Sequence, residues 1–241
     1  MHAWCARASA IVVLACTPTG PTHHPTDGKE DEKESSNALR VGHATCVVLA
    51  PCLEPLRHAL AKQPAMLVAM DKVIAHDRRA DLWIYASPPD RFDVVFVLPV
   101  QGDKPRKALA DAGLDVSGTD ASMSVGGWPA RIVDHRLLVA TDPAALRAAA
   151  KASEPSVAAN GAIAVAELDL AAVPDSVRTA WLDKLHEGKP GPPEILPTIA
   201  RAARVEAFAD AFRDGVRVDA KLAVHEGRQE LVVDVTAREG S

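Results

Sequence analysis

The sequence predicts an α+β protein built mainly from antiparallel sheet, with helices packed on one face. From Thr45 onward, short β-rich runs alternate with alanine-rich runs of helical periodicity, and short turns join most neighbouring strand runs. Hydrophobic residues make up 48% of the 241 residues, which is sufficient for a substantial core. The net charge is −5 and aromatic residues are only 4%, so the chain lacks the basic stripe and stacking rings typical of nucleic-acid binding. We therefore expect a globular protein without a nucleic-acid partner.

The first expected elements are a strand followed by a long helix. The run TCVVLA (45–50) is continuously apolar and has the length of a strand. From Pro55 to His76 apolar residues recur at helical spacing, and they include Val73 and Ile74. Pro64 lies inside this stretch and is expected to break or kink the helix.

A hairpin and a short helix come next. The β-rich runs 81–87 and 93–100 flank the turn signal PPDRF, which predicts two antiparallel strands. Residues 104–114 read as a helix, with Pro105 suited to its first turn and Gly113 to its exit.

The middle of the chain predicts a meander that leads into another helix. The runs 121–127, 130–134 and 136–141 are separated by short turns. Asp142 followed by Pro143 is a strong helix start, because the aspartate caps free backbone amides and proline has no amide to satisfy.

The C-terminal part repeats the alternation of strand and helix. Residues 161–170 predict a strand, and 174–188 a helix ending at Gly188. The segment 200–215 is ambiguous, and we expect helix to about Ala203 and strand from about Val205, ahead of an Asp214–Gly215 turn. The last expected strands are 216–224 and 229–237, and the second alternates as a strand with one wet face does.

Two similar halves are a possible organisation of the folded region. Residues 44–60 and 162–185 both run from an apolar strand into an amphipathic helix, and strand-rich sequence follows each. This predicts α+β halves at 41–152 and 153–241 that share one core. Identity between them is low, so chance similarity of two strand–helix units is an equal explanation.

The N-terminus is expected to carry an export signal. Arg7 precedes the apolar run Ala8 to Ala15, which is far shorter than the about 20 residues of a membrane span, so residues 1–15 read as a cleaved signal peptide. The sequence Val13-Leu14-Ala15-Cys16 resembles the lipobox of bacterial lipoproteins. The resemblance implies a diacylglycerol on Cys16, which becomes the N-terminus, while the alternatives are a plain signal peptide or a core strand.

Residues 16–40 are expected to be a disordered tether behind this anchor. Prolines, glycines and the charged run KEDEKE cannot bury enough apolar surface to fold. Thr17, rather than aspartate, follows the cysteine, so the resemblance implies the outer membrane more than the inner, with the domain facing the periplasm or the surface. The whole organisation resembles the alanine-rich lipoproteins of GC-rich bacteria.

Cys46 and Cys52 are the remaining cysteines, since Cys5 leaves with the signal peptide. An oxidising compartment favours a disulfide between them, but an extended chain over 46–50 would hold them about 20 Å apart, so the bridge requires a reversal near Pro51. Otherwise both are small buried residues. His43 and His58 flank them, but the spacing is not that of a zinc site, and we expect no metal.

The sequence gives no reason to name an enzyme or a cofactor. We find no phosphate-binding loop, nucleophile elbow, dinucleotide fingerprint or zinc-protease motif. The pairs His76-Asp77 and Asp134-His135 combine an imidazole with a carboxylate, but each lies at an element end, where charged residues are ordinary. We therefore assign no catalytic residue.

The expected function is binding or interaction without catalysis, at the cell envelope. The partner is either a protein or an apolar ligand, because the interior is built mainly from alanine, valine and leucine. The alternatives are a structural envelope component and, less favoured, an enzyme of unrecognised type.

Overall fold

The computed structural model describes residues 38–52, 73–87, 89, 91–102, 104–157, 160–186, 213–225 and 228–237. Residues 1–37, which contain the expected signal peptide, Cys16 and most of the tether, lie outside the described residues. So do 53–72, where most of the first long helix was expected, and 187–212.

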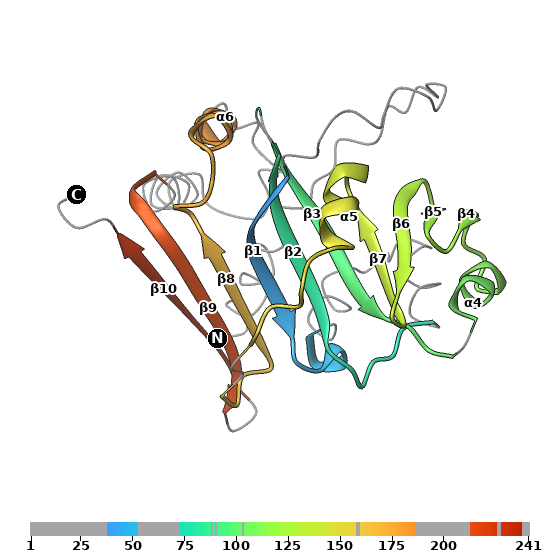
Figure 1. The fold of residues 1–241 in the computed structure, drawn as a ribbon. Coiled ribbons are helices and arrows are strands. Elements are labelled where there is room, and N and C mark those ends of the chain that lie inside the picture. The colour runs from blue at the N-terminus through green and yellow to red at the C-terminus, as the bar shows by residue number, and fades with distance from the viewer. Residues whose placement is uncertain are drawn as a thin grey trace, which may run out of the picture.

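One large antiparallel sheet organises the described residues (Figure 1). In chain order the elements are β1 (Leu39–Cys46), β2 (Ala80–Ser87), β3 (Arg91–Pro99), α4 (Pro105–Asp111), β4 (Val116–Thr119), β5 (Ser122–Val125), β6 (Trp128–Val133), β7 (Arg136–Ala140), α5 (Pro143–Ala149), β8 (Ala164–Asp169), α6 (Asp175–His186), β9 (Gly215–His225) and β10 (Arg228–Ala237). The ten strands lie in the order β10-β9-β8-β1-β2-β3-β7-β6-β5-β4. The fold is therefore α+β and mainly antiparallel, as predicted.

Several elements follow the sequence signals closely. β2 and β3 form the expected hairpin, and β5, β6 and β7 form the expected meander. Asp142 caps α5 by accepting a hydrogen bond from the Ala144 amide at 2.7 Å, and Pro105 occupies the first turn of α4. Gly113 follows α4 with a φ of +89°, a conformation that glycine adopts without steric cost. Local capping and turn chemistry was thus sufficient to place these elements.

β1 corrects the expected strand over 45–50. It begins at Leu39, within the segment read as tether, and ends at Cys46, after which residues 49–52 are helical. The Leu49 and Ala50 amides donate to the carbonyls of Arg78 and His76 at 3.1 and 3.0 Å, so this segment bonds to a turn rather than to a strand. Leu49 packs in the hydrophobic core from this helical turn, so its apolar side chain does not indicate that the strand continues.

Three further expectations differ from the structure. Val73 and Ile74 are not helical, and Ile74 instead forms an isolated bridge with Val100. Arg213 and Asp214 are helical, so no strand directly precedes β9, whose hairpin partner is β10. β4 was not predicted, because its sequence VSGT has no apolar pattern.

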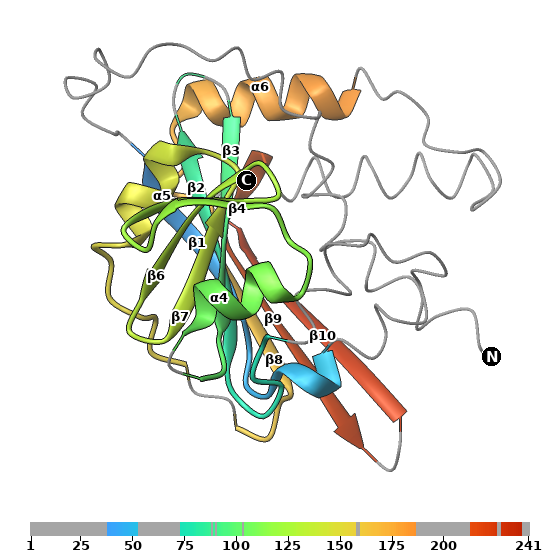
Figure 2. The same cartoon turned by 90° about the vertical axis from the view of Figure 1, so that its right-hand side faces the viewer.

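Helices lie on both faces of the sheet. α4 packs with Phe96 and Leu98 of β3, whereas α5 packs with Val95 and Val97 of the same strand. Successive side chains of a strand point to opposite faces, so these two helices cover opposite faces. The expected gathering of helices on one face is therefore not confirmed. Figure 2 shows α6 crossing one end of the sheet, while β9 and β10 extend from there towards the other end.

Two parts of the sheet match across the pair formed by β1 and β8. These strands are antiparallel with Ala44 opposite Ala166, and each is followed along the chain by an antiparallel hairpin, β2–β3 or β9–β10. A two-fold rotation about an axis between Ala44 and Ala166 would superpose β1 on β8, with Thr45 at the position of Glu167. Asp81 pairs with Thr45 and Asp219 pairs with Glu167, so these aspartates occupy matched positions. The same register places β3 on β10.

Matched arginines make matched ion pairs. Nε of Arg79 lies 3.0 Å from both carboxylate oxygens of Asp81, and Nε of Arg217 lies 2.8 Å from Oδ2 of Asp219. Arg79 also reaches the Thr45 hydroxyl at 3.4 Å, as Arg217 reaches the Glu167 carboxylate at 3.0 Å. The two Arg-x-Asp segments therefore perform the same structural task in two hairpins.

Candidate functional site

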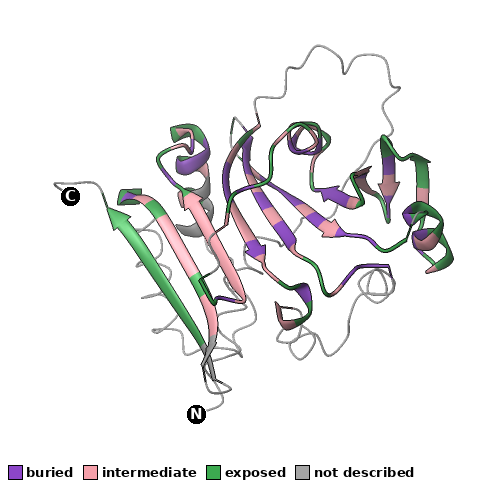
Figure 3. Ribbon diagram, turned by 60° about the horizontal axis from the view of Figure 1, so that its bottom comes forward, coloured by how far each residue is buried: buried purple, intermediate pink, exposed green. Residues whose placement is uncertain are grey.

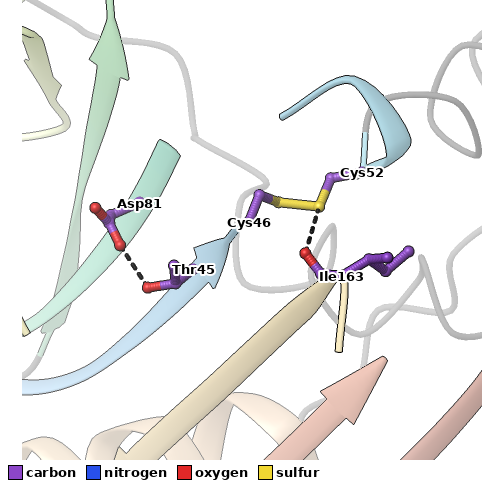
Figure 4. The surroundings of a disulfide bond; sticks show 5 residues. All are labelled: Thr45, Cys46, Cys52, Asp81 and Ile163. Atoms are coloured by element: carbon purple, nitrogen blue, oxygen red, sulfur yellow. Dashed lines mark hydrogen bonds between the residues drawn. A yellow bond between two sulfur atoms is a disulfide. The ribbon is translucent and has the colours of Figure 1, made fainter. Parts of the chain in front are cut away.

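Cys46 and Cys52 form a disulfide at the end of β1 (Figure 4). Their Cα atoms are 6.1 Å apart, because the chain turns at residues 47–48 instead of continuing as a strand. Sγ of Cys52 lies 3.6 Å from the carbonyl oxygen of Ile163, which precedes β8. The bridge therefore fastens the helical turn at 49–52 close to the junction between β1 and β8.

The alternative readings of nearby residues receive no support from this geometry. With Cys46 and Cys52 bonded to each other, their sulfurs are not metal ligands, and His58 lies outside the described residues. No group of three or more histidine, cysteine, aspartate or glutamate residues in the described ranges is arranged to hold a metal ion.

The two histidine–carboxylate pairs occupy turns. Asp134 and His135 have φ values of 47° and 58° and form the two-residue turn between β6 and β7. His76 and Asp77 lie in the turn before β2, where the His76 carbonyl accepts the Ala50 amide at 3.0 Å. The backbone geometry explains both positions without a catalytic role.

A polar hollow lies over the junction of β1 and β8. Its volume is about 320 Å³, and Arg40, Val41, Gly42, His43, Pro155, Ser156, Glu167 and Asp169 line it. The segment after α5 forms one wall, because Arg40 donates to the Ser153 carbonyl at 2.8 Å and Arg79 to the Pro155 carbonyl at 3.0 Å. Arg40 also stacks over Trp83 of β2, with its guanidinium carbon 5.2 Å from the ring centre.

His43 and Glu167 face each other across this hollow. They are directly opposite in the β1–β8 pair, so their side chains share a face. Burial lowers the pKa of His43, while the charges of Glu167 and Asp81 partly oppose this shift. A neutral imidazole beside a carboxylate can bind a polar group, and the sequence analysis had considered His43 only as a metal ligand.

A second hollow lies at the β4 edge of the sheet. It has a volume of about 460 Å³ and is lined by Lys104, Pro105, Arg106, Lys107, Ala110, Val116 and Asp120. Lys107 pairs with Asp111 one helical turn away, at 2.5 Å. Three of the seven lining residues are basic, and four of the seven lie on a seven-residue helix, so this is a solvated surface rather than a built site.

Four of the six large apolar residues that are exposed in the described ranges lie on β10, the terminal strand of the sheet; the other two are Leu39 and Val48. Leu231, Val232, Val233 and Val235 are between 40% and 47% exposed. Val232 and Val233 are adjacent and point to opposite faces, so β10 exposes apolar side chains on both, which corrects the expectation of a strand with one wet face. Figure 3 shows this strand exposed along its length, while β2 and β3 are largely buried. The edge position of β10 explains the difference, and it follows from sheet order rather than from sequence.

No helix among the described residues is long and apolar enough to cross a membrane. Cys16, the expected lipid site, lies outside the described residues. The comparisons with protein families, curated proteins and solved structures find no match for this chain.

Proposed function

We propose that the protein is a lipoprotein of the bacterial envelope that acts as a non-catalytic interaction module, with β10 as its contact surface. The lipobox-like sequence ending at Cys16 supports the anchor, which attaches the chain to a bilayer through an acyl group. The domain then faces the periplasm or the cell surface, on the outer membrane in preference to the inner.

The exposed apolar edge at β10 is the observation that carries the proposal. An edge strand presents unpaired backbone amides and carbonyls, and natural proteins usually protect such edges with charge, proline or covering elements. β10 contains the charged residues Arg228, Glu230 and Asp234, but it also exposes four large apolar residues and contains no proline. Backbone hydrogen bonds supply affinity when a strand is added at such an edge, and apolar side chains add buried area. A protein strand therefore suits this surface better than a small apolar ligand, since both described hollows are lined by charged residues.

The anchor is tested by labelling in a Gram-negative host. Cells that express the full chain are fed a labelled fatty acid, and we expect label on the protein and recovery in the outer-membrane fraction. Cys16→Ser is the matched control and should remove the label while leaving the domain intact. Equal labelling of both chains, or none of either, would refute the anchor.

The contact surface is tested by photo-crosslinking in the same cells. A photoreactive residue at Val235 of β10 is compared with one at Thr119, which is exposed at the opposite edge of the sheet. We expect a defined protein product from Val235 and not from Thr119, and its loss when Val233→Lys is added. Products of equal yield from both edges, or no product from β10, would count against an interaction role for this strand.

A further inference from the structure

We propose that two copies of the protein pair through β10, as antiparallel strands related by a two-fold axis at Val233, so that their sheets become continuous. The proposal rests on the proposed function in using β10 as the contact surface, but it does not depend on the lipid anchor.

One face of β10 is apolar together with the strand beside it. Leu231 lies opposite Leu222 of β9, Val233 opposite Ala220, and Val235 opposite Val218. In the proposed dimer Val233 meets Val233 of the second copy, and Leu231 meets Val235. The three rows of four side chains centred on the axis are therefore entirely apolar on this face.

The other face of β10 has charges that a second copy complements. Val232 lies opposite Lys221 of β9, and Thr236 lies opposite Arg217. With Val233 on the axis, Val232 of one copy faces Asp234 of the other, and Thr236 faces Glu230. Lys221 can therefore extend over Val232 towards Asp234 of the second copy, whereas Arg217 is already paired with Glu167 and Asp219 of its own copy. Asp234 of β10 thus receives a basic neighbour from the other copy.

Charge also disfavours the two registers with the axis at the adjacent residues Val232 and Asp234. A two-fold axis perpendicular to the continuous sheet leaves each side chain on the same face of the sheet. Residues paired across antiparallel strands share a face, so the axis must pass between one residue of β10 and the same residue of the second copy. An axis at Val232 would set Glu230 opposite Asp234, and an axis at Asp234 would set the two Asp234 carboxylates together. Like charges in directly opposite positions are destabilising. An axis at Leu231 avoids these contacts but shortens the paired stretch and leaves Val235 outside it.

β3, the strand that matches β10 in the other half of the sheet, has a further strand paired along the edge that β10 leaves open. β3 corresponds to β10 through the two-fold match, and β7 continues the sheet beyond it as an antiparallel strand. The side chain of Val95 in β3 is fully buried there, whereas Val232, at the matched position in β10, is 45% exposed. A second copy would supply to β10 the strand that β7 supplies to β3.

Sedimentation velocity over a range of concentrations tests the pairing. The full chain carries Cys16→Ser so that it stays unacylated, and we expect a reversible dimer. Val233→Lys would set two ammonium groups together at the axis and should raise the dimer dissociation constant at least about tenfold. Val232→Lys is the matched control, because it is equally exposed but faces Asp234 of the second copy, and it should leave the dimer intact. Circular dichroism checks that both variants fold alike.

Cysteine pairing tests the register in a chain that also carries Cys5→Ser. Val233→Cys brings two sulfurs opposite each other, with Cα atoms about 5 Å apart, whereas Val232→Cys lies diagonally from its copy at about 7–8 Å. A disulfide requires Cα atoms within about 7 Å, so we expect Val233→Cys to form a reducible dimer rapidly under mild oxidation and Val232→Cys to lag far behind.

Three results would overturn the pairing. They are a chain that is monomeric at every concentration, equal effects of the two lysine variants, and faster bridging by Val232→Cys. A monomeric chain that still gives the Val235 product in cells would reject the second copy as partner while leaving the interaction role in place. If that product is also absent, both proposals fail.

Discussion

Asp81 and Asp219 occupy matched positions in two strands but differ in burial. The Asp81 side chain is 4% exposed and pairs with Arg79 and the Thr45 hydroxyl, whereas the Asp219 side chain is 36% exposed. Asp81→Ala removes the carboxylate that accepts from the Arg79 guanidinium and from the buried Thr45 hydroxyl, so we expect the free energy of unfolding to fall by about 3 kcal/mol. Asp219→Ala should cost much less, because water solvates the exposed Arg217. Urea unfolding of both variants measures the difference, and equal losses would contradict this account.

Tyr85 reports its own burial, because it is the only tyrosine of the chain. Burial raises its pKa to about 12, against about 10 in an unfolded chain. Below pH 10 both states keep the proton, and between pH 10 and 12 only the unfolded state releases it, so stability should fall as pH rises through this window. Tyrosinate absorbance should titrate near pH 12 in the folded protein and near pH 10 in denaturant. A single midpoint near 10 in both conditions would show that Tyr85 is solvated.

The Tyr85 hydroxyl is buried and has no hydrogen-bond partner within the described ranges. Removing an unsatisfied buried hydroxyl while keeping the ring recovers its desolvation cost, so Tyr85→Phe should raise the free energy of unfolding by about 1 kcal/mol. Thermal or urea unfolding at neutral pH measures the change. A clear loss of stability in the variant would instead indicate that the hydroxyl is hydrogen-bonded.

At the scale of elements, the bridge between Cys46 and Cys52 closes a short loop after β1. Closing a loop of this length stabilises the folded state by about 2 kcal/mol in the chain-entropy description. We expect the exported protein to gain two hydrogens in mass on reduction, and the double variant Cys46→Ala, Cys52→Ala to lose about that much stability. Free thiols detected on both cysteines of the native exported protein would contradict the prediction.

Elements with local signals were predictable, and elements defined by distant partners were not. The α5 start at Asp142 and Pro143 and the turn after β2 are encoded within a few residues. The end of β1 at Cys46 depends on carbonyls near residue 78, which the sequence pattern of 45–50 does not reveal. The candidate surface on β10 is another nonlocal feature, because the alternation in its sequence does not indicate that it lies at the edge of the sheet.

At the scale of the whole molecule, the order of strands brings together residues that no motif connects. His43 faces Glu167 because β8 lies beside β1, and the repeated Arg-x-Asp signal at 79–81 and 217–219 acquires meaning only through the register of four strands. Sequence comparison of 44–60 with 162–185 had predicted similar halves from their order of elements. The strand register aligns the two halves residue by residue, and in this alignment Arg91 of β3 corresponds to Arg228 of β10.

The expectation that the two halves share one core can be tested through Leu170. This residue is fully buried in a cluster that joins Val41 and Ala86 of the N-terminal half to Val173 and Val177 of the C-terminal half. Leu170→Ala leaves a cavity at the junction and should lower the free energy of unfolding by about 2–5 kcal/mol.

Because one cluster and one sheet span both halves, this loss should extend through the whole molecule. Hydrogen exchange followed by mass spectrometry resolves the effect by segment, since exchange of well-protected amides reports cooperative opening. We expect Leu170→Ala to accelerate exchange in peptides from β2 and β3 as much as in peptides from β8 and β9. Leu109→Ala is the control, because it leaves a cavity in the cluster under α4, remote from the junction. If unfolding is cooperative, this variant should accelerate exchange of the same slowest-exchanging amides. Acceleration limited to β8, β9 and β10 would instead mean that the two halves open independently.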